Sequence, residues 1–253
     1  MDDAMRLFGL KAIVTGAANG IGEAVARTFV KHGAHVLSVD SPDSGIETLF
    51  SSVHGITGFA ADLSDAEAAG RIMEAAASTL GALDIIVNSY AIQSETPING
   101  SGDSALQGLL DRKIAIMTGI CDSALPLLKS SPAGRIINIG FIRSSFAKDG
   151  DDAFASAESA LAEYTANLAS AYGEFGITAN YIQPGAIMTP DSRDVFNKDM
   201  ALRDFCINRS AARRLGEPVD VAKVALFLAT DDAVFVSGTG VRVDGGDANA
   251  SGS

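Results

Sequence analysis

The chain has 253 residues, of which 47% are hydrophobic and 20% are charged, and its formal net charge at pH 7 is -12. This length and composition are typical of one α/β domain, which we expect to span residues 1–253. The acidic balance argues against nucleic acid or an anionic membrane as a partner, because both repel a negative surface. We interpret the charge as a solvated surface that favours solubility.

The chain contains two cysteines, Cys121 and Cys206, without a CxxC pair or a histidine cluster. The sequence therefore predicts reduced thiols in apolar surroundings, and neither a disulfide framework nor a metal site. Acidic residues precede a short apolar stretch at the N-terminus, unlike a secretory signal, and no apolar run is long enough to span a bilayer. We expect a cytoplasmic protein.

Short apolar runs rich in β-forming residues alternate with longer segments of helical period. We expect strands at residues 12–14, 35–39, 58–60, 83–87, 135–139, 178–182 and 240–243. The expected helices cover residues 20–32, 64–80, 104–129, 151–175 and 217–229. This alternation predicts an α/β fold of the Rossmann type, in which a single doubly wound parallel β-sheet is flanked by helices on both faces.

Local signals refine some of these boundaries. The segment SDAE at 64–67 has the pattern of a capping box, and Pro218 stands where a first helical turn tolerates proline. Residues 186–216 have mixed polarity and no strand period, so we expect a substrate-side excursion above the sheet, or a lid. The small, polar tail at 247–253 is predicted to be flexible.

A glycine-rich turn follows the first expected strand. The segment TGAANGIG at 15–22 leads directly into a helix. Its glycines let the backbone turn sharply and let a pyrophosphate approach the N–H groups at the helix start. The alternative is a tight turn without a ligand, which the spacing and context disfavour. We predict a dinucleotide site that contains Gly16, Asn19, Gly20, Ile21 and Gly22.

An acidic residue ends the second expected strand. Asp40 stands where a carboxylate can accept hydrogen bonds from both hydroxyls of an adenosine ribose, and where it would repel the 2'-phosphate of NADP. Neither Ala17 nor Ala18 supplies a positive charge to offset that repulsion. The sequence therefore predicts NAD(H) in preference to NADP(H). The alternative is that Asp40 merely begins the next turn.

At this point the chain resembles the short-chain dehydrogenase/reductase family over nearly its whole length. The segments RLGEP at 214–218 and VRVDGG at 241–246 also match the family's C-terminal third. The resemblance implies a cofactor site that further includes Asp62, Leu63, Asn88, Pro184, Gly185, Ile187 and Thr189. It also implies an oxidoreductase by family, a small-molecule ligand and assembly as a homotetramer or homodimer through the helices at 104–129 and 151–175.

The same resemblance locates the family's catalytic Asn, Ser, Tyr and Lys. These positions hold Lys113, Phe141, Phe154 and Glu158, so none of the four family residues is retained. A phenyl ring has no proton to give, and a glutamate has the opposite charge to a lysine. Loss of positioned acid–base catalysis costs on the order of 10² to 10⁴ in rate. We therefore predict that the standard Tyr/Lys proton transfer is lost.

The replacements allow more than one interpretation. Lys113 and Glu158 could form a swapped ion pair, or they could be two unrelated solvated side chains. Phe141 and Phe154 would line the pocket floor, either by filling the core or by recognising an apolar ligand.

Three functions remain open at this stage. The first is an NAD(H)-binding pseudo-enzyme that binds a ligand or regulates. The second is an active NAD(H)-dependent oxidoreductase on a small carbonyl or alcohol with a rewired site, in which Tyr90 or bound water supplies the proton. The third is a non-catalytic structural subunit of an oligomer. Loop residues that could bind an anion are Arg143, Ser144 and Ser145.

Overall fold

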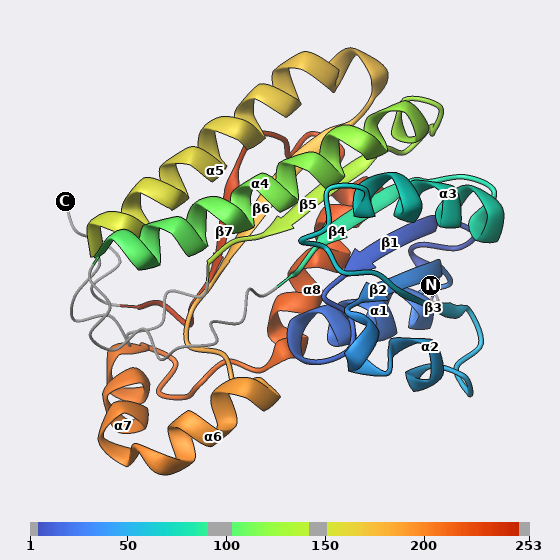
Figure 1. Cartoon of the computed structure of the whole chain (residues 1–253). Coiled ribbons are helices and arrows are strands. Elements are labelled where there is room, and N and C mark those ends of the chain that lie inside the picture. The colour runs from blue at the N-terminus through green and yellow to red at the C-terminus, as the bar shows by residue number, and fades with distance from the viewer. Residues whose placement is uncertain (1–4, 91–102, 142–150, 248–253) are drawn as a thin grey trace.

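The computed structural model describes residues 5–90, 103–141 and 151–247 (Figure 1). Seven strands form one parallel sheet in the order β3-β2-β1-β4-β5-β6-β7. The chain builds outward from β1 to β3, crosses back, and continues from β4 on the other side of β1, as the doubly wound prediction requires. The strands are β1 (Lys11–Thr15), β2 (His35–Asp40), β3 (Ile56–Ala60), β4 (Ile85–Asn88), β5 (Arg135–Ile139), β6 (Thr178–Pro184) and β7 (Gly240–Val243).

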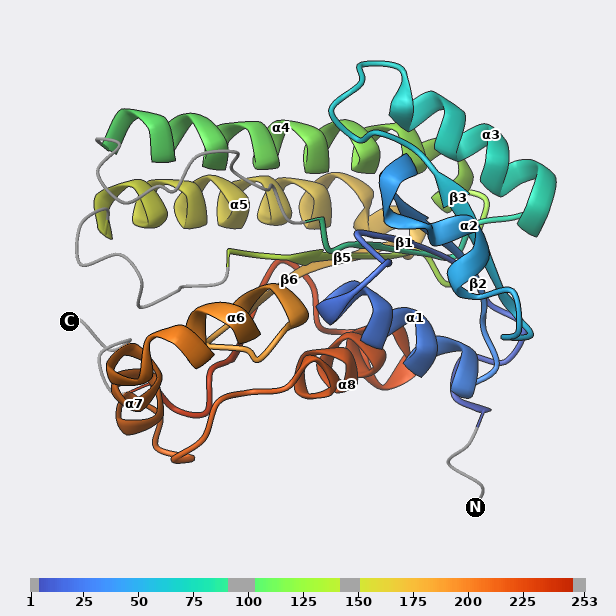
Figure 2. The ribbon, with the colours of Figure 1, turned by 60° about the horizontal axis from the view of Figure 1, so that its bottom comes forward.

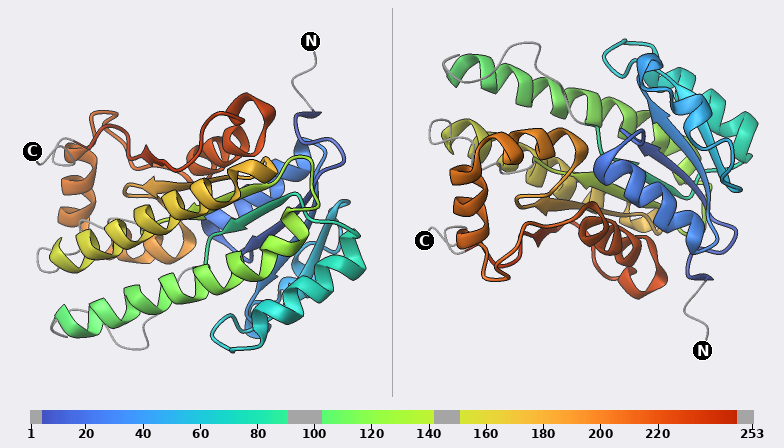
Figure 3. Two further views of the ribbon diagram at one scale, coloured as in Figure 1. Left: turned by 90° about the horizontal axis from the view of Figure 1, so that it is seen from above. Right: turned by 90° about the horizontal axis from the view of Figure 1, so that it is seen from below.

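Helices cover both faces of this sheet, which confirms the predicted fold class. Helices α3, α4 and α5 lie on one face, and α1 and α8 lie on the other (Figures 2 and 3). The helices are α1 (Gly20–Lys31), α2 (Ile46–Leu49), α3 (Ala68–Leu80), α4 (Asp103–Leu128), α5 (Asp151–Tyr172), α6 (Pro190–Lys198), α7 (Met200–Arg209) and α8 (Pro218–Ala229). Within the described ranges, no helix has both the length and the apolar character needed to cross a bilayer.

The sheet separates two apolar layers of the core. Successive strand residues point to opposite faces, so Val14 packs in the layer of α1 and α8, whereas its neighbour Ile13 packs in the layer of α3 and α4. Both side chains are fully buried. The two cysteines, Cys121 and Cys206, both lie in buried positions, which agrees with the apolar surroundings that the sequence predicts.

The capping box predicted at residues 64–67 was wrong. The hydroxyl of Ser64 donates to the Asp62 carboxylate at 2.7 Å, and the backbone N–H of Ser64 donates to the same oxygen at 2.9 Å. Asp65 accepts from the N–H of Glu67 at 3.0 Å, so two aspartate-centred turns replace the first turn of the helix. Helix α3 therefore begins at Ala68. Pro218 does occupy the first turn of α8, as predicted.

The predicted excursion at 186–216 contains two helices, α6 and α7, which the sequence analysis missed. A parallel bridge between Ile187 and Gly216 ties its two ends together. Arg209 at the end of α7 donates to both carboxylate oxygens of Asp247, at 2.9 and 2.8 Å. Asp247, the first residue of the predicted flexible tail, is therefore held by α7, and residues 248–253 lie outside the described residues.

Candidate functional site

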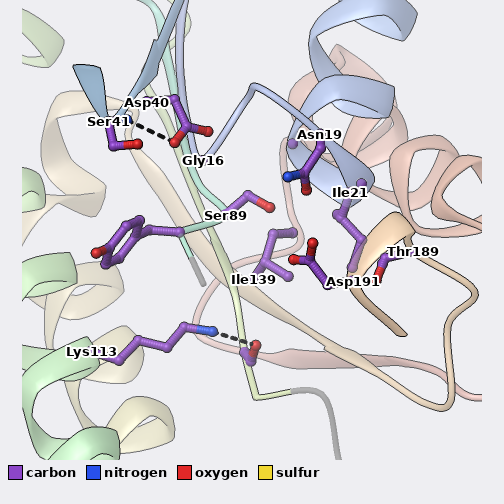
Figure 4. Close-up of a pocket in the computed structure, with 14 residues that line it drawn as sticks. Gly16, Asn19, Ile21, Asp40, Ser41, Ser89, Lys113, Ile139, Thr189 and Asp191 are labelled. Atoms are coloured by element: carbon purple, nitrogen blue, oxygen red, sulfur yellow. Dashed lines mark hydrogen bonds between the residues drawn. The ribbon is translucent and has the colours of Figure 1, made fainter. Parts of the chain in front are cut away.

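A pocket of about 260 Å³ opens at the carboxyl ends of the central strands (Figure 4). It is called the dinucleotide pocket below, after the ligand that the sequence predicts for its glycine turn. Its walls come from the glycine turn after β1, the end of β2, the ends of β4 and β5, helix α4 and the start of α6. The lining residues are Gly16, Asn19, Gly20, Ile21, Gly22, Asp40, Ser41, Ser89, Tyr90, Lys113, Ile139, Gly140, Thr189 and Asp191. This is the crevice at the topological switch point, where open α/β sheets bind their ligands.

The glycine turn is shaped by contacts that exclude any side chain. Gly16 has a φ of +63°, and a Cβ there would lie 2.7 Å from the backbone oxygen of Ser89. A Cβ on Gly22 would lie 2.0 Å from the backbone oxygen of Gly16. The turn is thus pressed against the end of β4, and α1 starts at Gly20 with its positive dipole end on the pocket wall.

Asp40 is held in a fixed orientation at one end of the pocket. One carboxylate oxygen accepts from the N–H of Ala18 in the glycine turn, and the other accepts from the N–H of Ser41, both at 2.8 Å. Each oxygen can accept further hydrogen bonds, because an ionised carboxylate has about four acceptor sites. The structure thus gives Asp40 a role in its own turn and leaves it able to accept from a ligand.

Lys113 reaches the other end of the pocket from α4. Its Nζ donates to the backbone oxygen of Gly140 at 3.0 Å and lies 5.1 Å from the centre of the Phe141 ring. Figure 4 shows Lys113 and Asp40 at opposite ends of the pocket, with Ser89 and Ile139 between them. Burial lowers the pKa of Lys113 to about 8, because removal from water disfavours its charged form.

The ion pair proposed between Lys113 and Glu158 was wrong. Lys113 is bonded to Gly140, and no ion pair joins it to Glu158 in the part of the chain that the structure describes. Glu158 lines a separate pocket at the ends of β6 and β7, together with Gln183 and Arg242. The two side chains leave neighbouring helices toward different pockets, so their opposite charges never meet.

Phe141 and Phe154 do not line the dinucleotide pocket. Phe141 is 3% exposed and belongs to an apolar cluster between α4 and α5, against which Phe154 packs. The prediction that both rings form the pocket floor was therefore wrong, whereas the core-filling interpretation agrees with their packing. The other buried members of this cluster are Leu106, Leu110, Met117, Ala153, Ala157 and Leu161.

Tyr90 lies on the pocket wall, as expected of a candidate proton donor. Burial raises the pKa of its phenol, and the negative charges of Asp62 and Asp40 raise it further. A less acidic phenol gives up its proton less readily, so this setting weakens Tyr90 as an acid. The candidate anion ligands Arg143, Ser144 and Ser145 lie outside the described residues.

Several residues predicted for the cofactor site lie away from this pocket. Asn88 is buried beneath it, where its Nδ2 donates to Asn138 at 2.9 Å and ties β4 to β5. Leu63 and Ile187 are buried in the apolar core. Pro184 and Gly185 line the separate pocket that contains Glu158, and Asp62 bonds to Ser64 in its own turn. The structure therefore assigns these six residues mainly to the architecture around the site.

The other predicted cofactor residues do meet at one place. Gly16, Asn19, Gly20, Ile21, Gly22, Asp40 and Thr189 all line the dinucleotide pocket. Thr189 begins α6, where its Oγ1 accepts from the N–H of Ser192 at 3.2 Å. A Cβ on Gly20 would lie 3.4 Å from the Thr189 methyl carbon, so the two motifs face each other.

Sequence analysis missed five lining residues: Ser41, Ser89, Ile139, Gly140 and Asp191. Ser41, Ser89 and Gly140 each stand next to a residue that the sequence analysis had already marked, and Ile139 ends β5 just before Gly140. Asp191 could have been found from the Thr-Pro signal of a helix start, because it occupies the first turn of α6. In the described ranges, no group of three or more His, Cys, Asp or Glu side chains is placed to hold a metal ion.

Comparisons with known proteins agree with this architecture. The family described as "Enoyl-(Acyl carrier protein) reductase" matches residues 16–247. Oxidoreductase UcpA of Escherichia coli is 30% identical over 252 residues, which cover 95% of each chain. The 3-oxoacyl-[acyl-carrier-protein] reductase FabG of Vibrio harveyi is 28% identical, over 96% of this chain and 98% of its own.

Two solved structures share the fold of this chain. A short-chain dehydrogenase/reductase from Brucella melitensis, described as a glucose/ribitol dehydrogenase, superposes with a TM-score of 0.83 at 25% identity, over 96% of this chain and 98% of its own. A putative gluconate dehydrogenase from Agrobacterium tumefaciens superposes with a TM-score of 0.82 at 25% identity, over 95% and 96% of the two chains. The chain therefore belongs to the short-chain dehydrogenase/reductase family and is an oxidoreductase by family, in which a nicotinamide dinucleotide is the cofactor.

Proposed function

We propose that the protein binds NAD(H) in the dinucleotide pocket and does not perform the Tyr/Lys-dependent carbonyl chemistry of its family. One observation carries this proposal: the glycine turn and Asp40 meet on one pocket wall, while Phe141 and Phe154 pack between α4 and α5 and Glu158 opens on a different pocket. This arrangement supports a cofactor site that lacks the proton relay of the family. The remaining activity would be ligand binding or regulation through the bound nucleotide.

The described residues fit a dinucleotide in an extended pose. The glycine turn and the start of α1 would hold the pyrophosphate, and the Asp40 carboxylate would accept from the adenosine ribose. Thr189, Ser89 and Lys113 would surround the nicotinamide end. A bound nicotinamide supplies hydride transfer as its own chemistry, whereas the protein supplies position and charge.

The preference for NAD(H) over NADP(H) rests on the setting of Asp40. Two backbone N–H groups fix its carboxylate, so the side chain cannot swing away from an added phosphate without losing both bonds. Among the described residues, the cation on the pocket wall is Lys113, at the far end from Asp40. A 2'-phosphate beside Asp40 would therefore meet an uncompensated negative charge.

A second candidate function is hydride transfer to a small carbonyl, or from a small alcohol, by a rewired site. Relatives named as reductases and oxidoreductases favour it, as does the ammonium of Lys113 at the nicotinamide end. Tyr90 is the weaker donor of the two, because burial and the charges of Asp62 and Asp40 raise its pKa.

Calorimetric titration with NAD, NADH and NADP tests the proposal. We expect the natural chain to bind NAD and NADH, and to bind NADP at least tenfold more weakly, a difference of about 1.4 kcal/mol. A variant that restores the family set, with Lys113→Asn, Phe141→Ser, Phe154→Tyr and Glu158→Lys, serves as the comparison. If only that variant bound NADH, the altered residues would exclude the cofactor and the proposal would fail.

We also propose that the protein is cytoplasmic and forms a homotetramer or homodimer through α4 and α5, which lie side by side on one face of the sheet (Figure 3). A non-catalytic subunit that pairs with an active relative is the alternative. Sedimentation of the isolated chain, followed by co-purification from its native source, separates the two assemblies. A pure homo-oligomer is the expected result.

A further inference from the structure

Lys113 is a partly buried cation whose described partners are neutral. Its Nζ donates to the Gly140 carbonyl and lies over the Phe141 ring. The ion pairs found in the described ranges are made by arginines, each with an aspartate or glutamate. Lys113 thus has no carboxylate partner among the described residues, although the protein pairs cations elsewhere.

Such a cation is costly unless something balances its charge. Withdrawal of an ammonium from water is unfavourable unless an opposite charge and full hydrogen bonding replace the lost hydration. A lysine ammonium has three N–H donors, and the Gly140 carbonyl takes one of them. The other two N–H donors remain for a ligand, because Lys113 lines the pocket. The positive charge of Lys113 and its position on the pocket wall together indicate that the pocket binds an anion.

We propose that Lys113 binds the carboxylate of a small organic anion at the inner end of the pocket, beside the dinucleotide. This proposal deepens the proposed function, because it names the class of ligand that the same site takes.

The other charges on the pocket wall select the kind of anion. Asp191 lies on the same wall, between Ile139 and Thr189 in Figure 4, and Asp40 lies at the far end. Two carboxylates disfavour a multiply charged anion such as a phosphate ester more strongly than a singly charged one. The volume of about 260 Å³ must also admit part of the dinucleotide. A small monocarboxylate fits both limits.

The dinucleotide itself is not the expected partner of Lys113. Its pyrophosphate would lie at the start of α1, beside Asn19 and Ile21, and Figure 4 shows these residues on the opposite side of Ile139 from Lys113. The ammonium therefore stays available to a second ligand when the nucleotide is bound.

The charge of Lys113 gives the interaction a defined pH range. Because burial lowers its pKa to about 8, the ammonium form dominates at pH 7 and is lost as the pH rises through 8. The other titratable side chains on the wall are Asp40, Asp191 and Tyr90, and the pKa of Tyr90 is raised. Asp111, which precedes Lys113 on α4 by two residues, and Arg112 are exposed. Carboxylate binding should therefore weaken above pH 8.

Calorimetric titration with acetate, propionate and butyrate, beside acetamide, propionamide and butyramide, tests the proposal with and without saturating NADH. We expect at least one acid to bind at least tenfold more tightly than its amide, as a charge-assisted hydrogen bond implies. Lys113→Met and Lys113→Gln should each remove this preference in the titration without NADH. Circular dichroism of both variants checks that they fold. Lys223→Met, at an exposed site on α8, is the control for loss of a positive charge.

The outcomes separate this inference from the proposed function. Failure of NADH to bind the natural chain would contradict the proposed function, and the titration without NADH would still report on the carboxylate. Absence of a preference for acid over amide in both titrations would overturn the inference while leaving NADH binding intact. Equal preference in the natural chain and the two Lys113 variants would overturn it as well.

Discussion

The two ends of the dinucleotide pocket are built in different ways. The end at Gly16 and Gly22 is made of backbone, where close contacts leave no room for a Cβ and one helix start supplies the charge. The end at Lys113 is made of single side chains that reach in from α4 and from the ends of β4 and β5. A backbone-built site persists as long as the fold persists, whereas a side-chain-built site can change its chemistry by a few substitutions. Under the proposed function, this difference would let the chain keep its cofactor site while its reaction changes.

The largest effect is expected at the backbone-built end. Gly16→Ala should lower NADH affinity on the order of 100-fold, because the new Cβ would meet backbone atoms of Ser89 at 2.7 Å and displace the turn. Gly45→Ala is the matched control, since Gly45 has a similar φ of +72° and no atom within 4 Å of the added Cβ. It should destabilise the protein without changing NADH affinity. Equal losses of affinity in both variants would show that strain alone matters.

The next largest effect is a change in the free energy of unfolding when Lys113 is replaced. Lys113→Met should stabilise the protein at pH 7 by up to about 3 kcal/mol, because the folded state holds the cation at a pKa of about 8 against 10.5 when exposed. Between these pH values the unfolded chain binds more protons, so the natural protein gains stability as the pH rises. The advantage of the variant should therefore be full below pH 8 and vanish above 10.5. Urea unfolding at pH 7 and near pH 10 measures the difference, and a constant difference would contradict it.

A moderate effect is expected for Asp40. Asp40→Ser should weaken NADH binding on the order of tenfold and bring NADPH closer to NADH in affinity, since the carboxylate that accepts from ribose and repels phosphate is removed. Asp43→Ser, at an exposed position close by, controls for the loss of one negative charge. Calorimetry with both nucleotides measures the ratio. An unchanged ratio would assign Asp40 to the turn alone.

The smallest effect on NADH affinity is expected for a substitution of Glu158. This residue occupies the position of the family's lysine by resemblance, yet it lines a different pocket. Glu158→Gln should therefore change NADH affinity by less than about threefold, which is less than 0.7 kcal/mol. Lys113→Gln, measured in the same titration, is the matched substitution of a residue that does line the dinucleotide pocket. A large loss of NADH affinity for Glu158→Gln would place that side chain at the cofactor after all.

The strand and helix pattern could be predicted because it depends on local periodicity. The predicted helix at 104–129 agrees with α4 to within one residue at each end, and all seven predicted strands are present. A predicted helix boundary was wrong where a side chain forms its hydrogen bond with a residue outside the helix. Ser64 bonds to Asp62 and not to the helix start, so α3 begins four residues late. Helices α6 and α7 were missed because both are short and each buries a single residue, Phe196 in α6 and Cys206 in α7.

The sequence by itself determined the fold, the glycine turn and the position of Asp40, because each depends on residues close together in the chain and on backbone geometry. Only the tertiary structure decided what Lys113, Phe141, Phe154 and Glu158 do. Their roles depend on how α4 and α5 rotate against each other and against the sheet, which sends Glu158 to one pocket and Lys113 to another. Opposite charges in the sequence suggest an ion pair, but helix packing fixes which side chains can meet.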